Sequence, residues 1–146
     1  MAADLVFVDT NVLLYEWDAH EPPKQARAAE WMSHLWETRT GRLSYQVLTE
    51  FYVTATQKLK PGLRQPVARR NARTFLAWRP VAVDSVVLEA AWRAQDDYTL
   101  SWWDALIVAA AQQAQCRFLL TEDLRAGQDF DGLIAVNPFR TAPPTC

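Results

Sequence analysis

The stretch Leu5-Val6-Phe7-Val8-Asp9-Thr10-Asn11 carries the clearest fold signal in the sequence, because an unbroken apolar run ends abruptly in three polar residues. Four apolar residues in succession are typical of a strand that is buried on both faces of a parallel sheet. Thr10 or Asn11 is suited to cap a helix from Val12 to Trp17. The stretch therefore predicts a buried strand followed at once by a helix, with Asp9 at the junction.

Strands and helices alternate in the same way along the rest of the chain. Periodic apolar positions with Pro, Gly, Asp and Ser signals predict helices at 22–39, 45–59, 66–78, 85–97 and 102–115. Short apolar runs predict strands at 42–44, 81–83, 117–120 and 133–136. This order indicates an α/β fold with a central, mainly parallel sheet flanked by helices, in a single domain over residues 1–146 with its core at about 4–140.

The composition is that of a folded protein without membrane contact. Half of the residues are hydrophobic and 22% are charged, a balance that supports a packed core. No apolar run reaches the ~18 residues that a membrane span needs, and no signal-peptide pattern is present. The cysteines, Cys116 and Cys146, have no metal-type spacing, so we expect a cytoplasmic protein.

Four acidic residues are distant in sequence but predicted to lie at one edge of the sheet. Asp9 follows the first strand and Asp123 follows the strand at 117–120. Ligands of open parallel sheets bind beyond the carboxyl ends of the strands. Glu50 lies in the second turn and Asp104 in the first turn of helices that begin at the same edge. We therefore expect Asp9, Glu50, Asp104 and Asp123 to share one small volume.

Four carboxylates in a small volume repel one another, and a hard divalent cation offsets that repulsion well. Such an ion can bind a phosphate oxygen and activate water for attack on phosphorus. The sequence therefore predicts a Mg²⁺ site, with Mn²⁺ as a substitute, held by Asp9, Asp104 and Asp123. Glu50 completes the catalytic set by binding the ion or positioning water.

Each acid also has a structural explanation when it is considered alone. Asp9 can cap the following helix, Asp104 can complete a capping box that begins at Ser101, and Asp123 can cap a turn at Leu124. Glu50 alone is most simply a solvent-exposed side chain. The remaining acids of this region are expected at the surface or in loops: Glu122, Asp129 and Asp131.

The basic residues are distributed unevenly. From Phe51 to Val83 the chain has no Asp or Glu. Such a stretch marks either a surface for a polyanion or a solvated helix face whose acidic partners come from elsewhere in the fold. Under the first hypothesis the residues that contact an RNA backbone are Lys58, Lys60, Arg69, Arg70 and Arg73.

Five segments, in order and spacing, resemble the PIN-domain nucleases and most closely the VapC-type toxins of toxin–antitoxin pairs. They are Val8-Asp9-Thr10-Asn11-Val12-Leu13-Leu14-Tyr15, Gln46-Val47-Leu48-Thr49-Glu50-Phe51-Tyr52, Ser101-Trp102-Trp103-Asp104 with the apolar run to Ala111, Leu120-Thr121-Glu122-Asp123-Leu124, and Ile134-Ala135-Val136-Asn137-Pro138-Phe139. No single segment is specific by itself, whereas the ordered set is.

The resemblance implies a PIN-like fold and an endoribonuclease that depends on Mg²⁺ or Mn²⁺. It implies that Asp9, Glu50, Asp104 and Asp123 form the acidic set, and that Asn11 and Thr121 orient carboxylates or water. It also implies a homodimer and a small VapB-like antitoxin that blocks the site.

Other classes of protein fit the sequence less well. An aspartate-nucleophile phosphatase has a second Asp two residues after the first, where this chain has Asn11. The four glycines form neither a P-loop nor a dinucleotide fingerprint. A PIN-like binding protein without catalysis stays open, although the intact acids argue against it. The tryptophans suit core positions of helices, and some of them can instead face a partner.

Overall fold

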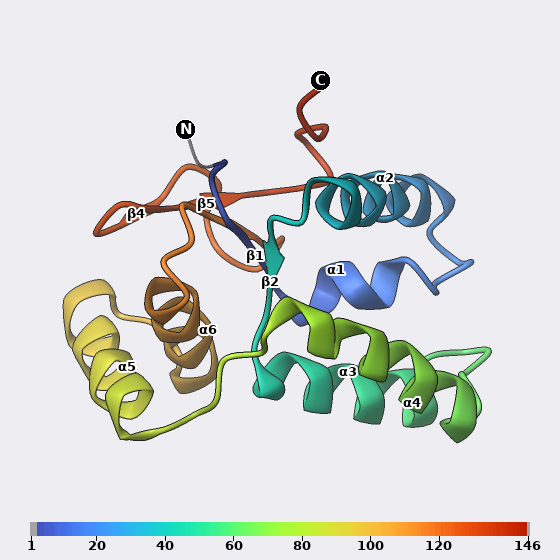
Figure 1. Ribbon diagram of the computed structural model, residues 1–146, viewed down its shortest axis with the longest axis horizontal. Helices are drawn as coiled ribbons and strands as arrows, with labels where there is room; N and C mark the ends of the chain where they lie inside the picture. The colour runs from blue at the N-terminus through green and yellow to red at the C-terminus, as the bar shows by residue number, and fades with distance from the viewer. Residues whose placement is uncertain (1–2, 146) are drawn as a thin grey trace.

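A five-stranded sheet in the order β2-β1-β3-β5-β4 organises the chain (Figure 1). The computed structural model describes residues 3–145. The parallel strands are β1 (Val6–Val8), β2 (Gly41–Arg42), β3 (Phe118–Leu120) and β5 (Leu133–Val136), whereas β4 (Asp129–Phe130) runs antiparallel to β5. The expected α/β fold with a mainly parallel sheet is confirmed.

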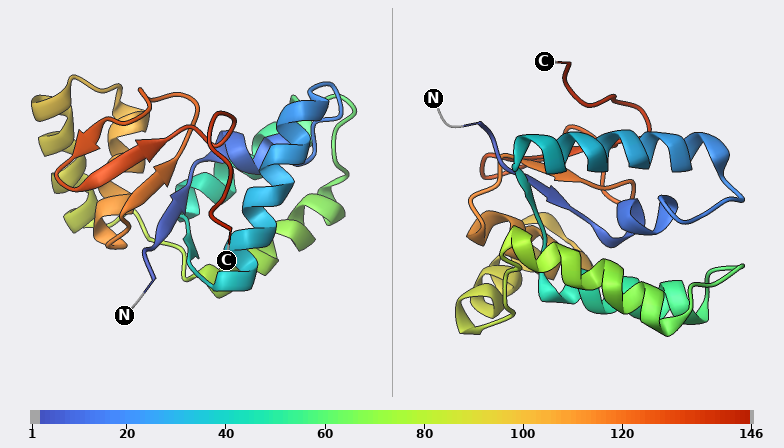
Figure 2. Two further views of the ribbon diagram at one scale, coloured as in Figure 1. Left: turned by 90° about the horizontal axis from the view of Figure 1, so that it is seen from above. Right: turned by 45° about the vertical axis from the view of Figure 1, so that its right-hand side comes forward.

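Helices cover both faces of this sheet. They are α1 (Thr10–Tyr15), α2 (Pro22–Thr38), α3 (Tyr45–Gln57), α4 (Gln65–Thr74), the 3₁₀ helix η1 (Phe75–Trp78), α5 (Ser85–Tyr98) and α6 (Trp102–Gln113). Figures 1 and 2 show α2 on one side of the sheet with the C-terminal tail, and α3, α4, α5 and α6 on the other side. None of the helices in residues 3–145 has the length and apolar character needed to cross a membrane.

The core is built on the central strands. Phe7, Val8, Leu119 and Leu120 are fully buried, as a strand enclosed on both faces requires. In α6 every residue from 105 to 111 is buried, because this helix packs between α5 and the sheet. Cys116 is also buried, whereas Cys146 lies outside the described residues.

The first helix begins earlier than the sequence predicted. It covers Thr10–Tyr15, because the carboxylate of Asp9 accepts the Thr10 backbone N–H at 2.7 Å and takes the N-cap position. The expectation of a helix from Val12 to Trp17, capped by Thr10 or Asn11, was therefore wrong by two residues at each end. The helix instead starts directly from the end of β1.

Residues 81–83 do not form the expected strand. Val81 makes a single parallel bridge with Ser44, in which the Tyr45 N–H donates to the Val81 carbonyl at 3.0 Å. Ala82 and Val83 are exposed, because the chain leaves the sheet there and begins α5 at its N-cap Asp84. The expected helix at 66–78 is also divided, since α4 ends at Thr74 and η1 continues it.

The short strand β4 was missed by the sequence analysis. It pairs with β5 across a tight turn in which Asp131 and Gly132 have φ angles of 55° and 98°. An Asp-Gly pair that accepts positive φ at both positions is a strong hairpin signal. This dipeptide between Phe130 and Leu133 would have revealed the hairpin.

Gly41 in β2 lies against the indole ring of Trp78. A Cβ atom at Gly41 would come within 2.5 Å of Trp78 Cη2 and Cζ2. Glycine is therefore required here for packing, because Trp78 is buried and also contacts Phe75 edge to face at 4.9 Å between ring centroids.

We predict that Gly41→Ala lowers the free energy of unfolding by about 1–3 kcal/mol, the usual cost of overpacking a core. Urea denaturation measures this loss. Adding Trp78→Phe removes the ring that the new methyl group meets, so the double variant should lose less than the sum of the two single losses. Strict additivity would show that the indole is not the cause.

Candidate active site

The backbone brings Asp9 and Thr121 together at the carboxyl edge of the sheet. The Asp9 N–H donates to the Leu120 carbonyl at 3.0 Å, and the Thr121 N–H donates to the Val136 carbonyl at 3.0 Å. These bonds continue the pairing of β1 with β3 and of β3 with β5 by one residue. As a result the Thr121 hydroxyl donates to Asp9 Oδ2 at 2.8 Å.

Asp9 is a buried carboxylate with only 6% of its surface exposed. Burial is the main reason why its pKa is raised to about 7, and the negative charges of Asp123 and Glu50 raise it further. Hydrogen bonds from Thr121 and from the Thr10 N–H lower the pKa but only partly offset burial. Asp9 therefore caps α1 and also belongs to an acidic group, so its two expected roles coexist.

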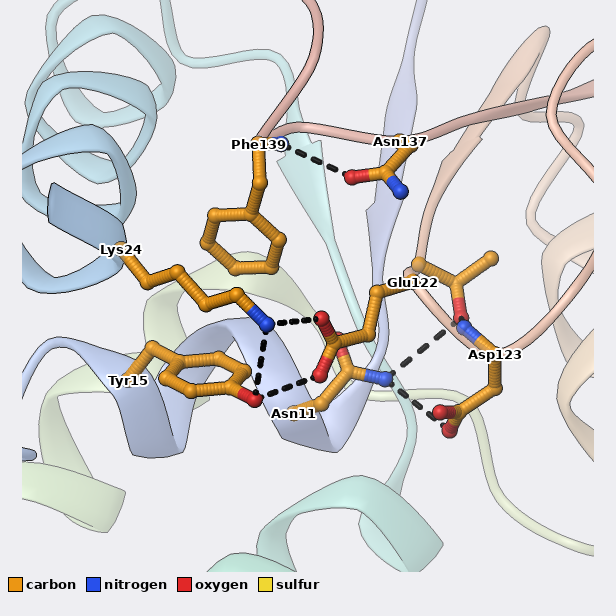
Figure 3. Close-up of polar contacts among 8 residues, drawn as sticks. Asn11, Tyr15, Lys24, Glu122, Asp123, Asn137 and Phe139 are labelled. Atoms are coloured by element: carbon orange, nitrogen blue, oxygen red, sulfur yellow. Dashed lines mark hydrogen bonds and ion pairs between the residues drawn. The ribbon is translucent and has the colours of Figure 1, made fainter. Parts of the chain in front are cut away.

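Asn11 lies between two of the acids. Its Nδ2 is 3.0 Å from Asp123 Oδ2 (Figure 3). The same Nδ2 is 3.5 Å from Asp9 Oδ2 and 3.5 Å from Thr121 Oγ1. The Asp123 N–H in turn donates to Thr121 Oγ1 at 3.1 Å. Asn11 and Thr121 thus both contact carboxylates of the acidic group.

Glu50 reaches the group from α3. The Thr10 hydroxyl donates to Glu50 Oε2 at 2.9 Å, and Gln46 Nε2 donates to Oε1 at 3.0 Å. The side chain is therefore half-buried and held from two sides, unlike a freely solvated surface acid.

Asp104 reaches the group from the first turn of α6. Its N–H donates to the Oγ of the N-cap residue Ser101 at 3.2 Å, so capping fixes the start of the helix. Burial raises the pKa of Asp104, a hydrogen bond with Ser101 lowers it, and the charges of Asp123 and Glu50 raise it. Asp123 and Glu50 therefore lie within electrostatic reach of both Asp9 and Asp104.

The geometry of the four acids is open. Within residues 3–145 no three acidic, histidine or cysteine side chains are close enough to hold one metal ion as they stand. The Asn11 amide between Asp9 and Asp123 accounts for part of this spacing. The donor set nevertheless fits a hard cation, because all four acids offer oxygen and because Asn11 Oδ1 and Gln46 Oε1 are buried acceptors with no donor in the described chain.

A family model described as the PIN domain matches residues 6–129. The chain belongs to the PIN-domain family. The structure is similar to a chain of a toxin–antitoxin complex from Klebsiella pneumoniae, with 20% identity and a TM-score of 0.62 over 91% of this chain and 97% of that one. It is also similar to VapC20 of Mycobacterium tuberculosis, described as a sarcin–ricin loop cleaving toxin, with 22% identity and a TM-score of 0.59 over 81% and 91%. No curated protein matches the sequence.

Glu122 of this PIN domain lies in a loop, as expected, but its carboxylate is held by two side chains and is not freely solvated. Its carboxylate accepts from Lys24 Nζ at 2.8 Å and from the Tyr15 hydroxyl at 2.6 Å, and Lys24 also lies over the rings of Tyr15 and Phe139 (Figure 3). The bond to Glu122 is the main reason why the pKa of Lys24 is raised. This network ties the loop that carries Asp123 to α1 and α2. Sequence patterns do not reveal it, since Lys24 and Glu122 are 98 residues apart.

The basic residues between Phe51 and Val83 of the PIN domain have no acidic partners within the described part of the chain. None of the seven Lys and Arg residues between Phe51 and Val83 forms an ion pair there. Lys58 lines a hollow of about 250 Å³ together with Asn11, Tyr15 and Glu122. The remaining candidates for RNA contact are exposed: Lys60, Arg69, Arg70 and Arg73. None of them lines this hollow or a separate hollow, which Glu50 lines.

The raised pKa of Asp9 predicts how the stability of the metal-free protein varies with pH. The pKa is about 7 in the folded protein and near 3.8 when unfolded. The folded state therefore binds more protons at Asp9 between these values, so the contribution of Asp9 to stability is fully present below pH ~4 and is lost as the pH rises through ~7. Asp9→Asn should thus gain stability relative to wild type over that range, on the order of a few kcal/mol.

Urea unfolding at a series of pH values in EDTA measures this difference. Asp96→Asn is the matched control, because Asp96 is an exposed residue of α5. The two proteins are compared by their free energies of unfolding. If the difference between Asp9→Asn and wild type does not vary with pH, the Asp9 carboxylate is charged at neutral pH and its neighbours already stabilise that charge.

Proposed function

We propose that the chain is a metal-dependent endoribonuclease and the toxin of a VapBC-type toxin–antitoxin pair. The observation that carries the proposal is the buried Asp9 carboxylate, which lies among three other acids where β1 and β3 of a PIN domain end. Burying such a group among like charges lowers stability, and that cost is offset when a cation occupies the site.

The chain's own residues hold and orient the acids. Thr121 and the N–H of Thr10 position the two oxygens of Asp9, and the Thr10 hydroxyl positions Glu50. Asn11 connects Asp123 to Asp9. A bound Mg²⁺ or Mn²⁺ would neutralise Asp9, Asp104 and Asp123 and stabilise negative charge on the scissile phosphate. Glu50 would position the water that adds across the phosphodiester.

The alternative of an aspartate-nucleophile phosphatase is less consistent with the position of Asp9. A nucleophilic carboxylate must present a free oxygen to phosphorus. Both oxygens of Asp9 already accept hydrogen bonds, and the side chain is almost fully buried. The residue is therefore better suited to binding a cation than to forming a covalent intermediate.

The principal test is RNA cleavage. Asp9→Asn and Asp104→Asn should each lower the cleavage rate by at least about a hundredfold in Mg²⁺ or Mn²⁺, because each removes a charge that the reaction requires. EDTA should abolish wild-type cleavage, and Asp96→Asn should cleave normally. Wild-type rates in a folded Asp9→Asn preparation would refute the proposed site.

Metal binding can be tested without any substrate. An ion that binds only the folded protein stabilises it by about 2.7 kcal/mol at a hundredfold excess over its dissociation constant. Asp123→Asn should melt no lower than wild type in EDTA, because it relieves repulsion, and should gain less from Mn²⁺. A lower melting temperature in EDTA with an undiminished Mn²⁺ shift would make Asp123 a structural residue.

The proposed partner is a small antitoxin, and the proposed assembly is a homodimer. Support for the antitoxin comes from the Klebsiella pneumoniae structure, which is described as a toxin–antitoxin complex. The homodimer rests on the family resemblance alone. An arginine of such an antitoxin can pair with the carboxylates and compete with the metal. Expression of the chain alone should slow growth and coexpression with the antitoxin should restore it, whereas harmless expression of an active chain would argue against a toxin.

Lys58 is the basic residue best placed to contact the RNA backbone. It lies beside Asn11 and Glu122, whereas Arg69 donates to the Tyr52 hydroxyl at 3.2 Å and packs over that ring. Lys58→Gln should flatten the dependence of log Kd on log salt by about 0.7, the value for one phosphate contact on a single strand. The triple variant Arg69→Gln, Arg70→Gln, Arg73→Gln provides the comparison. If only the triple variant changes the slope, the backbone crosses α4 instead.

A further inference from the structure

We propose that the hollow beside Glu50, walled by Tyr45 and Trp103, is a nucleobase-binding subsite that holds a base next to the scissile phosphate. The inference rests on the proposed RNA cleavage, and it identifies the residues that would favour certain positions along a single strand. The hollow has a volume of about 650 Å³ and is lined by Tyr45, Gln46, Thr49, Glu50, Ala82, Val83 and Trp103.

Aromatic, acidic and basic side chains follow one another along α3. Gln46, Glu50 and Thr54 are four residues apart, so they lie one above another on one face of the helix over about 12 Å. The aromatic hollow lies at the first turns of α3, and Glu50 belongs to its wall. The second hollow, with Asn11 and Lys58, lies at the last turn. A strand that follows this face passes from aromatic rings to the acids and then to a basic side chain.

Both aromatic rings of the hollow are exposed to solvent. Trp103 is 62% exposed and Tyr45 is 49% exposed, although both are large side chains that folding normally buries. Exposed aromatic groups that border a hollow mark a binding surface. Bases stack on such rings with little regard to sequence, since every base has a π-face.

The hollow is directly linked to the acids. Gln46 lines the hollow and donates through Nε2 to Glu50 Oε1 at 3.0 Å. Trp103 immediately precedes Asp104 in α6. A base held here would therefore place its own phosphate within reach of the acidic group.

The charges favour RNA over a protein segment as the occupant. The path along α3 continues to Lys58 and to the stretch between Phe51 and Val83, whose basic residues have no ion pair in the described chain. Unpaired cations at the exit of a groove attract a polyanion. An apolar protein segment would use the rings but would leave these cations without a partner.

The test compares intact RNA with RNA that lacks one base. Short single-stranded RNAs, each with an abasic residue at a different position around the cleavage point, are bound in Mn²⁺ to protein carrying Asp9→Asn. Removal of the stacked base should weaken binding by about tenfold at one position. Trp103→Leu should weaken binding of intact RNA by about the same factor and should then be insensitive to the abasic residue.

Matched variants separate stacking from general apolar contact. Tyr45→Phe keeps the ring and should bind like wild type, whereas Tyr45→Leu should lose affinity. Trp92→Leu is the control, because Trp92 is 49% exposed on α5 but lies outside the hollow. Melting temperatures confirm that each variant is folded.

The outcomes distinguish this inference from the nuclease proposal. One outcome is that wild type cleaves RNA, while in the Asp9→Asn background the Trp103→Leu variant binds intact and abasic RNA just as protein with Trp103 does. In that case the subsite is overturned and the nuclease stands. If the base-dependent loss occurs but wild type cleaves nothing, the subsite stands and the nuclease fails. If the Trp103 and Tyr45 variants keep RNA binding and cleavage but are no longer neutralised by an antitoxin, the hollow is a protein-docking site and the inference is wrong.

Discussion

The carboxylate of Asp9 couples the fold of this PIN domain to its chemistry. The backbone N–H of this residue extends the pairing between β1 and β3, and its side chain caps α1. The same side chain accepts the Thr121 hydroxyl and feels the charges of Asp123 and Glu50. Any displacement of Asp9 would therefore disturb the sheet edge, the first helix and the acidic group together.

Around the buried Asp9 carboxylate, the residues that the structure describes offer several hydrogen-bond donors but no fixed cation. The Thr10 N–H, the Thr121 hydroxyl and the Asn11 amide lie beside Asp9, while Lys24 is taken up by Glu122. Neutral donors orient a carboxylate without cancelling its charge, so the acids keep a negative potential. An arrangement of this kind leaves the cation to be supplied from solution.

The α3 helix arranges the rest of the surface around the acids. One of its faces carries Gln46 and Glu50, and the hollows at its two ends contain aromatic and basic side chains respectively. The opposite contacts of α3 are structural, since Val47, Phe51 and Ala55 are buried in the core. One helix thus supplies packing on one side and, on the other, the face along which we propose that a single strand runs.

Local sequence determined the elements whose signals are local. The apolar run of β1, the caps Asp84 and Ser101, and the acids that follow the strands are each visible in a few consecutive residues, and the parallel sheet then places strand ends on one edge. The Asp131-Gly132 hairpin had such a signal too, although it was missed.

Only the tertiary structure decided features that depend on residues far apart in the chain. The Thr121 hydroxyl reaches Asp9, Val81 kept only a single bridge, and Glu122 turned inward to Lys24 and Tyr15. The same holds for the hollow that joins Tyr45 to Trp103. Sequence periodicity states which face of an element is apolar, whereas the partner that a polar side chain meets is set by three-dimensional packing of segments that no local pattern relates.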